Sequence, residues 1–402
     1  MSDPQSQLAA PASPPNLLLA AMVAAGPIAM SIYVPALPLI GADLGAAEHQ
    51  VELTVTLYFI VFAVGQLLIG PMSDSWGRKR MALIGITAYA IGGLTSALAP
   101  DITVLMAGRM VQAFGGAAGV VLARTILKDV HDGDRMAQAL ARVVMISAIA
   151  PIIAPAVGGF ISEHYGWRST LFLLVALSLV IMTAIVFKLP ETAPKDDADR
   201  SFSGYLKVYL GLLRNVPFLS YNVHASLFSV TYFGFLTGMP LILTATIGLG
   251  TAAFGAWYTV IPVSYLLGNA LASRMVRLTG MRRVLFFGTF ISTGGVAVMV
   301  ALSIVLTPSA PIFFIPAMAM AFGHGMGMPN VTALAMTHVP TRAGTAVAAM
   351  GAVQMTSASI GSAIVSAFDG STAWPVLITM MLAQGAASLM VVRSVLRGHS
   401  WR

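Results

Sequence analysis

Long apolar runs alternate with short polar segments along the whole chain. Twelve runs of about 20 residues lie near 17–40, 51–72, 81–99, 102–123, 137–161, 168–189, 218–245, 254–275, 284–306, 311–336, 344–368 and 374–395. An α-helix needs about 20 apolar residues to cross the hydrocarbon core of a bilayer. Because a helix satisfies its backbone hydrogen bonds within its own segment, lipid tolerates it well. The pattern therefore predicts an all-α membrane protein with twelve transmembrane helices.

The basic residues fall almost entirely on one side of these predicted spans. If both termini are cytoplasmic, all of the 22 Lys and Arg residues except Arg109 and Arg168 lie in cytoplasmic loops, in the tail or at cytoplasmic span ends. The opposite loops carry acids, which are Asp43, Glu48, Asp101, Glu163 and Asp369. Cytoplasmic loops of membrane proteins carry an excess of Lys and Arg. We therefore expect a multi-pass protein of the inner (cytoplasmic) membrane with both termini in the cytoplasm.

Composition supports a lipid environment. The hydrophobic fraction is 57%, the charged fraction 9% and the mean hydropathy +0.84, whereas about a quarter of an average soluble domain is charged. The net charge of +7 follows the membrane side and so does not indicate nucleic-acid binding. Without Cys, disulfides and thiolate metal sites are excluded. Residues 1–16 lack the basic residues of a signal peptide, and we expect a cytoplasmic N-terminal tail there, with a C-terminal one at 396–402.

The longest predicted loop divides the chain into two parts. Residues 190–217 begin with a charged stretch and continue with apolar residues along one helical face, which is typical of a helix lying in the membrane interface. We therefore expect an N-terminal six-helix bundle at 17–189 and a C-terminal six-helix bundle at 218–395, as in transporters built from two parallel repeats. The segments 70–80 and 273–283 have related Gly and Arg spacing at an offset of 203 residues, which indicates duplication.

The turn after the second predicted span contains small and charged residues in a distinctive order. Gly70 permits close helix approach, and Gly77 suits a tight turn. Asp74 can interact with a helix N-terminus or a nearby Arg. Together with Arg78 and Lys79, this order resembles the loop motif of the major facilitator superfamily. The resemblance implies a cytoplasmic latch between the two halves.

Two further stretches narrow this resemblance. The segment from Arg109 to Gly116 in the fourth span resembles the buried-arginine motif of the superfamily. The fifth span is similar to the antiporter motif of its drug:proton exporters, although Ala150 stands where that motif has its first glycine. The matching residues are Pro151, Pro155, Gly158 and Gly159. The resemblance implies that they bend this helix at the interface between the halves.

The first and last spans point to one group within the superfamily. The segments Tyr33 to Pro38 and Thr372 to Pro375 resemble the bicyclomycin/chloramphenicol-resistance exporters. The resemblance covers essentially the whole chain and implies the major facilitator fold, with two six-helix bundles, and proton-driven export. Members usually carry Asp two residues before the Tyr of the first span, where this chain has Ser31. Because an intramembrane acid is the usual proton site, the coupling residue is left open.

Few titratable groups lie within the predicted spans. Arg109 is the clear mid-span charge, and we expect a function for it because such a charge is costly in lipid; a helix brace is the alternative. Glu52 is either a proton site or a residue that snorkels to the outer surface. His324 and His224 could titrate near neutral pH, or they could pack as neutral side chains.

Aromatic and amide side chains complete the candidate substrate pathway. Apolar walls with a few polar groups suit amphipathic ligands, although ordinary helix packing is the alternative for each residue. These candidates are Tyr33, Tyr58, Gln112, Tyr232, Tyr258, Asn330 and Gln354.

We predict a secondary active exporter of small amphipathic, neutral or zwitterionic compounds, exchanged for protons by alternating access. A specific metabolite exporter or an uncoupled facilitator is the alternative, and Ser31 favours it. The absence of a P-loop argues against ATP drive, and the absence of His-x3-His or paired intramembrane acids argues against a membrane enzyme. We expect a monomer that needs no cofactor or metal. Its expected partners are a small-molecule substrate, protons and the lipid bilayer, without nucleic acid.

Overall fold

The computed structural model describes residues 14–131, 133–193, 210–212, 214–339, 343–368 and 372–396. The first half of this described chain contains α1 (Asn16–Ser31), η1 (Val34–Ala36), α2 (Leu37–Leu44), α3 (Glu48–Trp76), α4 (Arg78–Ala97), α5 (Ile102–Val130), α6 (Gly133–Tyr165) and α7 (Trp167–Lys188). The second half contains α9 (Val216–Ile247), α10 (Thr251–Thr279), α11 (Met281–Val305), α12 (Ala310–Met336), α13 (Ala343–Ser366) and α14 (Trp374–Leu396). The predicted interfacial helix and both predicted tails lie largely outside the described residues.

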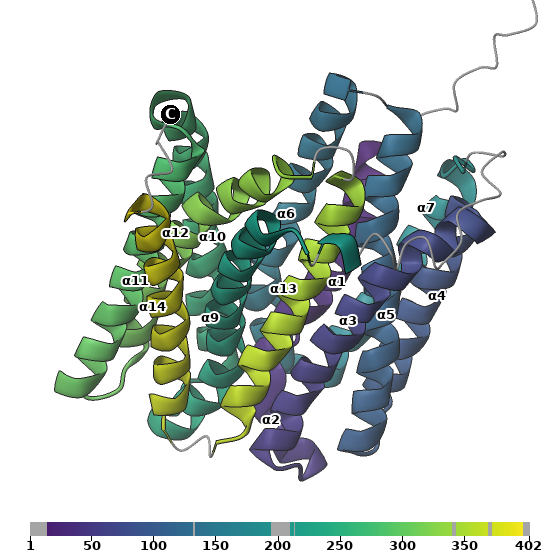
Figure 1. The fold of residues 1–402 in the computed structure, drawn as a ribbon. Helices are drawn as coiled ribbons and strands as arrows, with labels where there is room; N and C mark the ends of the chain where they lie inside the picture. The colour runs from purple at the N-terminus through teal and green to yellow at the C-terminus, as the bar shows by residue number, and fades with distance from the viewer. Residues whose placement is uncertain are drawn as a thin grey trace, which may run out of the picture.

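Twelve spans result when α1, η1 and α2 are taken as one broken span. Ten of the twelve are long and apolar enough to cross a membrane by length and composition alone. The other two, α4 and α10, pack extensively against α5 and α12, respectively, and complete the two six-helix bundles. The helices α1–α7, purple to teal, lie beside the helices α9–α14, teal to yellow (Figure 1). The main contacts between the halves join α3 to α13 and α6 to α10.

The first span differs from the continuous helix predicted at 17–40. The α-helix ends at Ser31, a 3-10 turn follows at Val34–Ala36, and α2 begins at Leu37. Pro35 and Pro38 have no backbone N–H group and so cannot complete the helical hydrogen bonds across this region. The break places Tyr33 in an irregular segment in the middle of the span.

The two ends of the bundle carry opposite charges. At one end, which we call the basic end, Gly77 and Gly280 form tight turns with φ of +90° and +83°, and Arg and Lys residues follow each of them. The other end, which we call the acidic end, carries Asp43, Glu48 and Glu163. It includes α2, at the lower edge of Figure 1.

Glycine contacts repeat in the two halves. A methyl group on Gly115 of α5 would lie 2.4 Å from the carbonyl oxygen of Gly85 in α4. A methyl group on Gly323 of α12 would lie 2.4 Å from the carbonyl oxygen of Gly288 in α11. Gly85 and Gly288 are 203 residues apart, and Gly115 and Gly323 are 208 apart. The pair α4 and α5 therefore packs in the same way as the pair α11 and α12, which supports the predicted duplication.

Candidate functional site

Arg109 of α5 is fully buried in the first half. Its guanidinium carbon lies 4.2 Å from the ring centre of Tyr33 and 4.3 Å from that of Tyr58. Its Nη1 donates to Gln112 Oε1 at 2.6 Å and to the carbonyl oxygen of Ala29 at 3.3 Å. A desolvated cation between aromatic faces gains about 2 kcal/mol or more from such contacts. These contacts unite four of the predicted pathway residues in one cluster, which we call the Arg109 cluster.

The tyrosines of the Arg109 cluster are held by their own hydrogen bonds. Tyr33 Oη lies 2.8 Å from Thr54 Oγ1, and Tyr58 Oη donates to the carbonyl oxygen of Gly26 at 3.0 Å. Thr54 was not among the sequence candidates, since a lone Thr in an apolar run gives no signal. The two rings are therefore fixed against the guanidinium group.

The Arg109 cluster lacks an acid among the described residues. The ion pairs of the described chain involve Arg78 and Arg168, not Arg109. Arg109 Nε and Nη2 and Gln112 Nε2 are buried and have no hydrogen-bond partner in the described part of the chain. Ser31, where the family resemblance leads one to expect Asp, is half-buried at the end of α1. The cluster is thus a buried positive charge with free N–H donors.

In the described part of the second half, the positions that correspond to Arg109 and Tyr58 carry apolar residues. Applying the offset of 208 residues, the position of Arg109 corresponds to Ala317 in α12. With the offset of 203, Tyr58 corresponds to Ile261 in α10. Both equivalents are fully buried and apolar. The two halves therefore share a backbone arrangement but differ in chemistry.

The two predicted histidines lie in the interior of the second half. His324 stacks on Phe228 with ring centres 4.3 Å apart, and His224 meets the same ring edge-on at 4.8 Å. His324 Nε2 lies 2.6 Å from the amide nitrogen of Gln384, and His224 Nε2 lies 3.1 Å from Thr289 Oγ1. Gln384 was missed because α14 offers no local pattern around it. Each histidine thus has a polar partner inside the packed bundle.

The remaining cavity candidates occupy separate places. Tyr258 donates to Tyr232 Oη at 2.9 Å, which joins α10 to α9. Asn330 donates to the carbonyl oxygen of Met326 within its own helix at 2.7 Å. Gln354 is half-buried on α13. Hydrogen bonds and ring contacts therefore group some of the candidates, but they do not join all of them into one site.

Glu52 lies in the seam between α3 and α13 near the acidic end. Its side chain is 4% exposed, and the side chain of Ser366 in α13 lies next to it. One turn further along α3, Thr56 Oγ1 lies 2.7 Å from Ser362 Oγ. This placement does not fit a side chain that snorkels to the outer surface. Polar residues four apart on each helix, Glu52 and Thr56 in α3 and Ser362 and Ser366 in α13, are the sequence signal that could have located this seam.

The part of α6 that resembles the antiporter motif forms a second seam between the halves. Pro151 and Pro155 both lie inside α6. A methyl group on Gly255 of α10 would lie 2.2 Å from the carbonyl oxygen of Pro155. Such a distance requires a residue without a side chain, because the two backbones nearly touch.

The two glycines of this motif face different partners. A methyl group on Gly158 would lie 2.1 Å from the carbonyl oxygen of Ile32, in the break of the first span. A methyl group on Gly159 would lie 2.3 Å from the carbonyl oxygen of Thr251, in the other half. Through these two glycines, α6 packs closely against both the broken first span and α10.

The latch motif surrounds Arg78, which is 1% exposed. Arg78 forms ion pairs with Asp74 and, at 2.8 Å, with Asp129 near the end of α5. Its Nη1 also donates to Ser73 Oγ at 2.9 Å. These bonds tie α3, α4 and α5 together within the first half. A contact of this motif with the second half stays a prediction.

Glu191, just after α7, caps the start of α4. Its carboxylate accepts hydrogen bonds from the backbone N–H groups of Arg78 at 2.8 Å and Lys79 at 3.2 Å. Lys79 Nζ donates to the carbonyl oxygen of Val186 at 2.8 Å. A methyl group on Gly77 would lie 2.6 Å from Glu191 Oε2, so glycine leaves room for the carboxylate. Glu191 and Asp129 were missed because each is more than 50 residues from Arg78.

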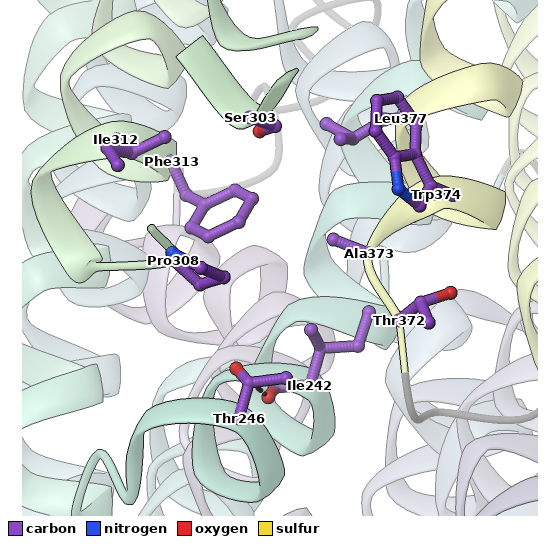
Figure 2. Close-up of a pocket in the computed structure, with 10 residues that line it drawn as sticks. All are labelled: Ile242, Thr246, Ser303, Pro308, Ile312, Phe313, Thr372, Ala373, Trp374 and Leu377. Carbon is purple, nitrogen blue, oxygen red and sulfur yellow. Dashed lines mark hydrogen bonds between the residues drawn. The ribbon is translucent and has the colours of Figure 1, made fainter. Parts of the chain in front are cut away.

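A small cavity lies at the acidic end of the second half. It has a volume of about 200 Å³ and opens between α9, the α11–α12 connection and the start of α14 (Figure 2). Phe313, Trp374 and Leu377 give it apolar walls, with Thr246 and Ser303 at its side. Ligand pockets usually measure about 300–1,000 Å³. The cavity holds none of the pathway candidates and is separate from the Arg109 cluster.

Comparisons with known proteins agree on the kind of molecule. The family model of the Major Facilitator Superfamily matches residues 17–366. A bicyclomycin resistance protein homolog of Haemophilus influenzae is 28% identical, with 88% of this chain and 89% of that protein aligned. Multidrug resistance protein D of Escherichia coli is 26% identical, with 88% and 87% aligned. A crystal structure of the peptide transporter POT in complex with sulfate superposes with a TM-score of 0.79 at 12% identity, covering 99% of both chains.

These matches confirm the predicted all-α fold of twelve spans in two six-helix bundles and the resemblance to drug-resistance exporters. The relatives and structural neighbours are membrane transporters, which confirms that the chain is a transporter rather than an enzyme. The family model covers well over half of the chain. This multi-pass membrane protein therefore belongs to the major facilitator superfamily.

Proposed function

We propose that this chain is a secondary active exporter in a bacterial inner membrane, with its basic end and both termini in the cytoplasm. It exports small amphipathic, neutral or zwitterionic compounds in exchange for protons and acts as a monomer. The names of its relatives, a bicyclomycin resistance protein homolog and multidrug resistance proteins, support export of drug-like molecules. The excess of Lys and Arg at the basic end supports the orientation.

Alternating access is supported by the contacts between the halves. Near the acidic end, Thr56 contacts Ser362 and Gly159 packs directly on Thr251, so both seams are closed there. With the orientation proposed above, the closed ends of both seams face the outer side of the membrane. Transport then requires the two halves to rock so that the seams part at the acidic end, as in other transporters built from two repeats.

The observation that carries the substrate class is the Arg109 cluster. Arg109 is a buried cation without an acid among its described contacts, and Ser31 supplies no charge nearby. A permanently cationic substrate beside the cluster would lose hydration without gaining a counter-ion, which is costly in a low dielectric. Compounds with hydrogen-bond acceptors and no positive charge are therefore preferred over quaternary ammonium dyes.

Glu52 is the best-supported proton carrier. It is a buried carboxylate within a span, and it lies in a seam that parts when the halves rock. Intramembrane acids of this kind mark proton pathways. The competing proposals are an uncoupled facilitator and a specific metabolite exporter, which Ser31 favours. Substrate-induced proton movement in proteoliposomes over a compound panel separates them, because an uncoupled facilitator moves no protons with its substrate.

We expect Ser31→Asp to extend resistance towards lipophilic cations by at least about tenfold. At an effective dielectric of about 20, an added carboxylate stabilises a cation 4 Å away by up to about 4 kcal/mol. The measurement is a susceptibility panel in an efflux-deficient host, and Ser31→Asn is the uncharged control of similar size. If the unmodified protein already exports chiefly lipophilic cations, and Glu52→Gln leaves that export intact, the proposed substrate class is wrong.

A further inference from the structure

We propose that Glu163, near the end of α6, is a positioning residue that holds the acidic end closed by capping α10 of the other half. Its Oε2 accepts a hydrogen bond from the backbone N–H of Ala252 at 2.8 Å and one from Thr251 Oγ1 at 3.2 Å. Both partners belong to the first turn of α10. The inference rests on the alternating access proposed above.

The duplicated helix in the first half shows what α10 lacks. The helix start at Ala47 in α3 corresponds to Gly250 in α10, 203 residues later. In α3, Gln50 Oε1 accepts the N–H of Ala47 at 3.0 Å, and Glu48 lies in the first turn. In α10, Gly250 has no side chain, and the first turn contains no acid. Polar side chains of α3 itself therefore stabilise its start, whereas the start of α10 is capped by a carboxylate from the other half.

This difference makes the cap depend on the conformation. The first N–H groups of a helix have no partner within the helix, and a nearby carboxylate both accepts their hydrogen bonds and interacts favourably with the helix dipole. Glu163 can reach Ala252 only while α6 and α10 are in contact at the acidic end. When the seam parts, water replaces the carboxylate. The capping interaction therefore stabilises the closed acidic end relative to the open one.

Packing around this contact agrees with such a role. Glu163 is itself exposed at the acidic end, so water can replace it without a buried charge being left behind. A methyl group on Gly250 would lie 3.1 Å from Glu163 Oε2, so the glycine lets the carboxylate approach. Thr251 Oγ1 also contacts the carbonyl oxygen of Gly159 at 3.3 Å. The carboxylate thus completes the same seam that the antiporter motif forms.

The test measures the ratio of open to closed acidic ends directly. Because the chain has no Cys, cysteines at Leu98 and Leu306, both exposed after the peripheral helices α4 and α11, can carry a pair of spin labels. We expect Glu163→Ala to raise the open-to-closed ratio by about fivefold, as for the loss of one capping group. Glu163→Gln should have a smaller effect, since the amide still accepts a hydrogen bond. Glu48→Gln, which removes an acid from the same end without a contact to the other half, should leave the ratio unchanged.

A second variant tests whether Glu163 holds the acidic end closed or only stabilises α10. Gly250→Ser in the Glu163→Ala background gives α10 a cap of its own, because serine at this position accepts N–H groups of the first turn. We expect it to restore thermal stability while the ratio stays shifted towards open. An unchanged ratio in Glu163→Ala, or a ratio restored together with stability by Gly250→Ser, overturns the role of Glu163. A single distance in every condition and variant contradicts alternating access itself.

Discussion

Valine in place of Gly159 is expected to reduce transport strongly while leaving each half folded. The three heavy atoms nearest to a methyl group at this position all belong to Thr251 and Ala252 of α10, and the closest is 2.3 Å away. The backbones of α6 and α10 must therefore separate, and overpacking of this kind costs about 1–3 kcal/mol or more. That cost falls on the closed acidic end alone and corresponds to about a 5- to 150-fold loss of this state. Efflux from proteoliposomes measures the loss.

The matched control for this prediction is Gly294→Val in α11. No heavy atom lies within 4 Å of a methyl group at Gly294, so the added side chain meets open space. Transport by this variant should remain close to that of the unmodified protein. If Gly159→Val transports normally, the contact between α6 and α10 is not required in the transport cycle.

The replacement Arg78→Gln is expected to lower the free energy of unfolding by roughly 3 kcal/mol or more. Asp129 is then left without the ion-pair partner that lies 2.8 Å away, and breaking a buried pair costs about 3–5 kcal/mol. Asp74 loses its ion pair with the same guanidinium. Thermal unfolding in detergent should show the loss as a markedly lower midpoint.

Arg80→Gln provides the comparison, since Arg80 follows the same turn but is exposed. Substitutions of exposed residues usually change stability by about 0.5 kcal/mol or less. Equal unfolding midpoints for the Arg78 and Arg80 variants would show that the buried network contributes little to stability. A lower midpoint for Arg78→Gln alone assigns this motif a structural role within the first half, in addition to any latch it forms between halves.

The spans and their grouping could be predicted because lipid imposes them on local sequence. An apolar run of about 20 residues identifies a transmembrane helix without any knowledge of the helices around it. The break of the first span is a different case. Pro35 and Pro38 were visible, but helices in membranes tolerate proline when neighbours satisfy the freed backbone groups, so proline alone does not predict a break. The packing of Gly158 against Ile32 supplies the missing information.

The candidate site was only partly predictable because its partners are distant in sequence. Arg109 stands out in an apolar run, yet nothing local places Tyr33 and Tyr58 on either side of it. From the sequence alone, Glu163 is one more acid of a predicted outer loop. Its meaning depends on a helix that begins 88 residues later, where Gly250 and its neighbours provide no cap. Such contacts between separate halves leave no periodic trace in either segment.

The matched glycine contacts bear on how the two halves could have diverged after duplication. In the first half, Tyr89 of α4 reaches across to the carbonyl oxygen of Ala25 in α1. The corresponding residue of α11 is Ser292, and in that half a histidine of α12, His324, stacks on Phe228 of α9 instead. The large side chain therefore comes from α4 in the first half but from α12, which is not the counterpart of α4, in the second half. A single helix transplanted from one half into the other would bring two bulky groups or none, so the helices of the present halves are not interchangeable one at a time.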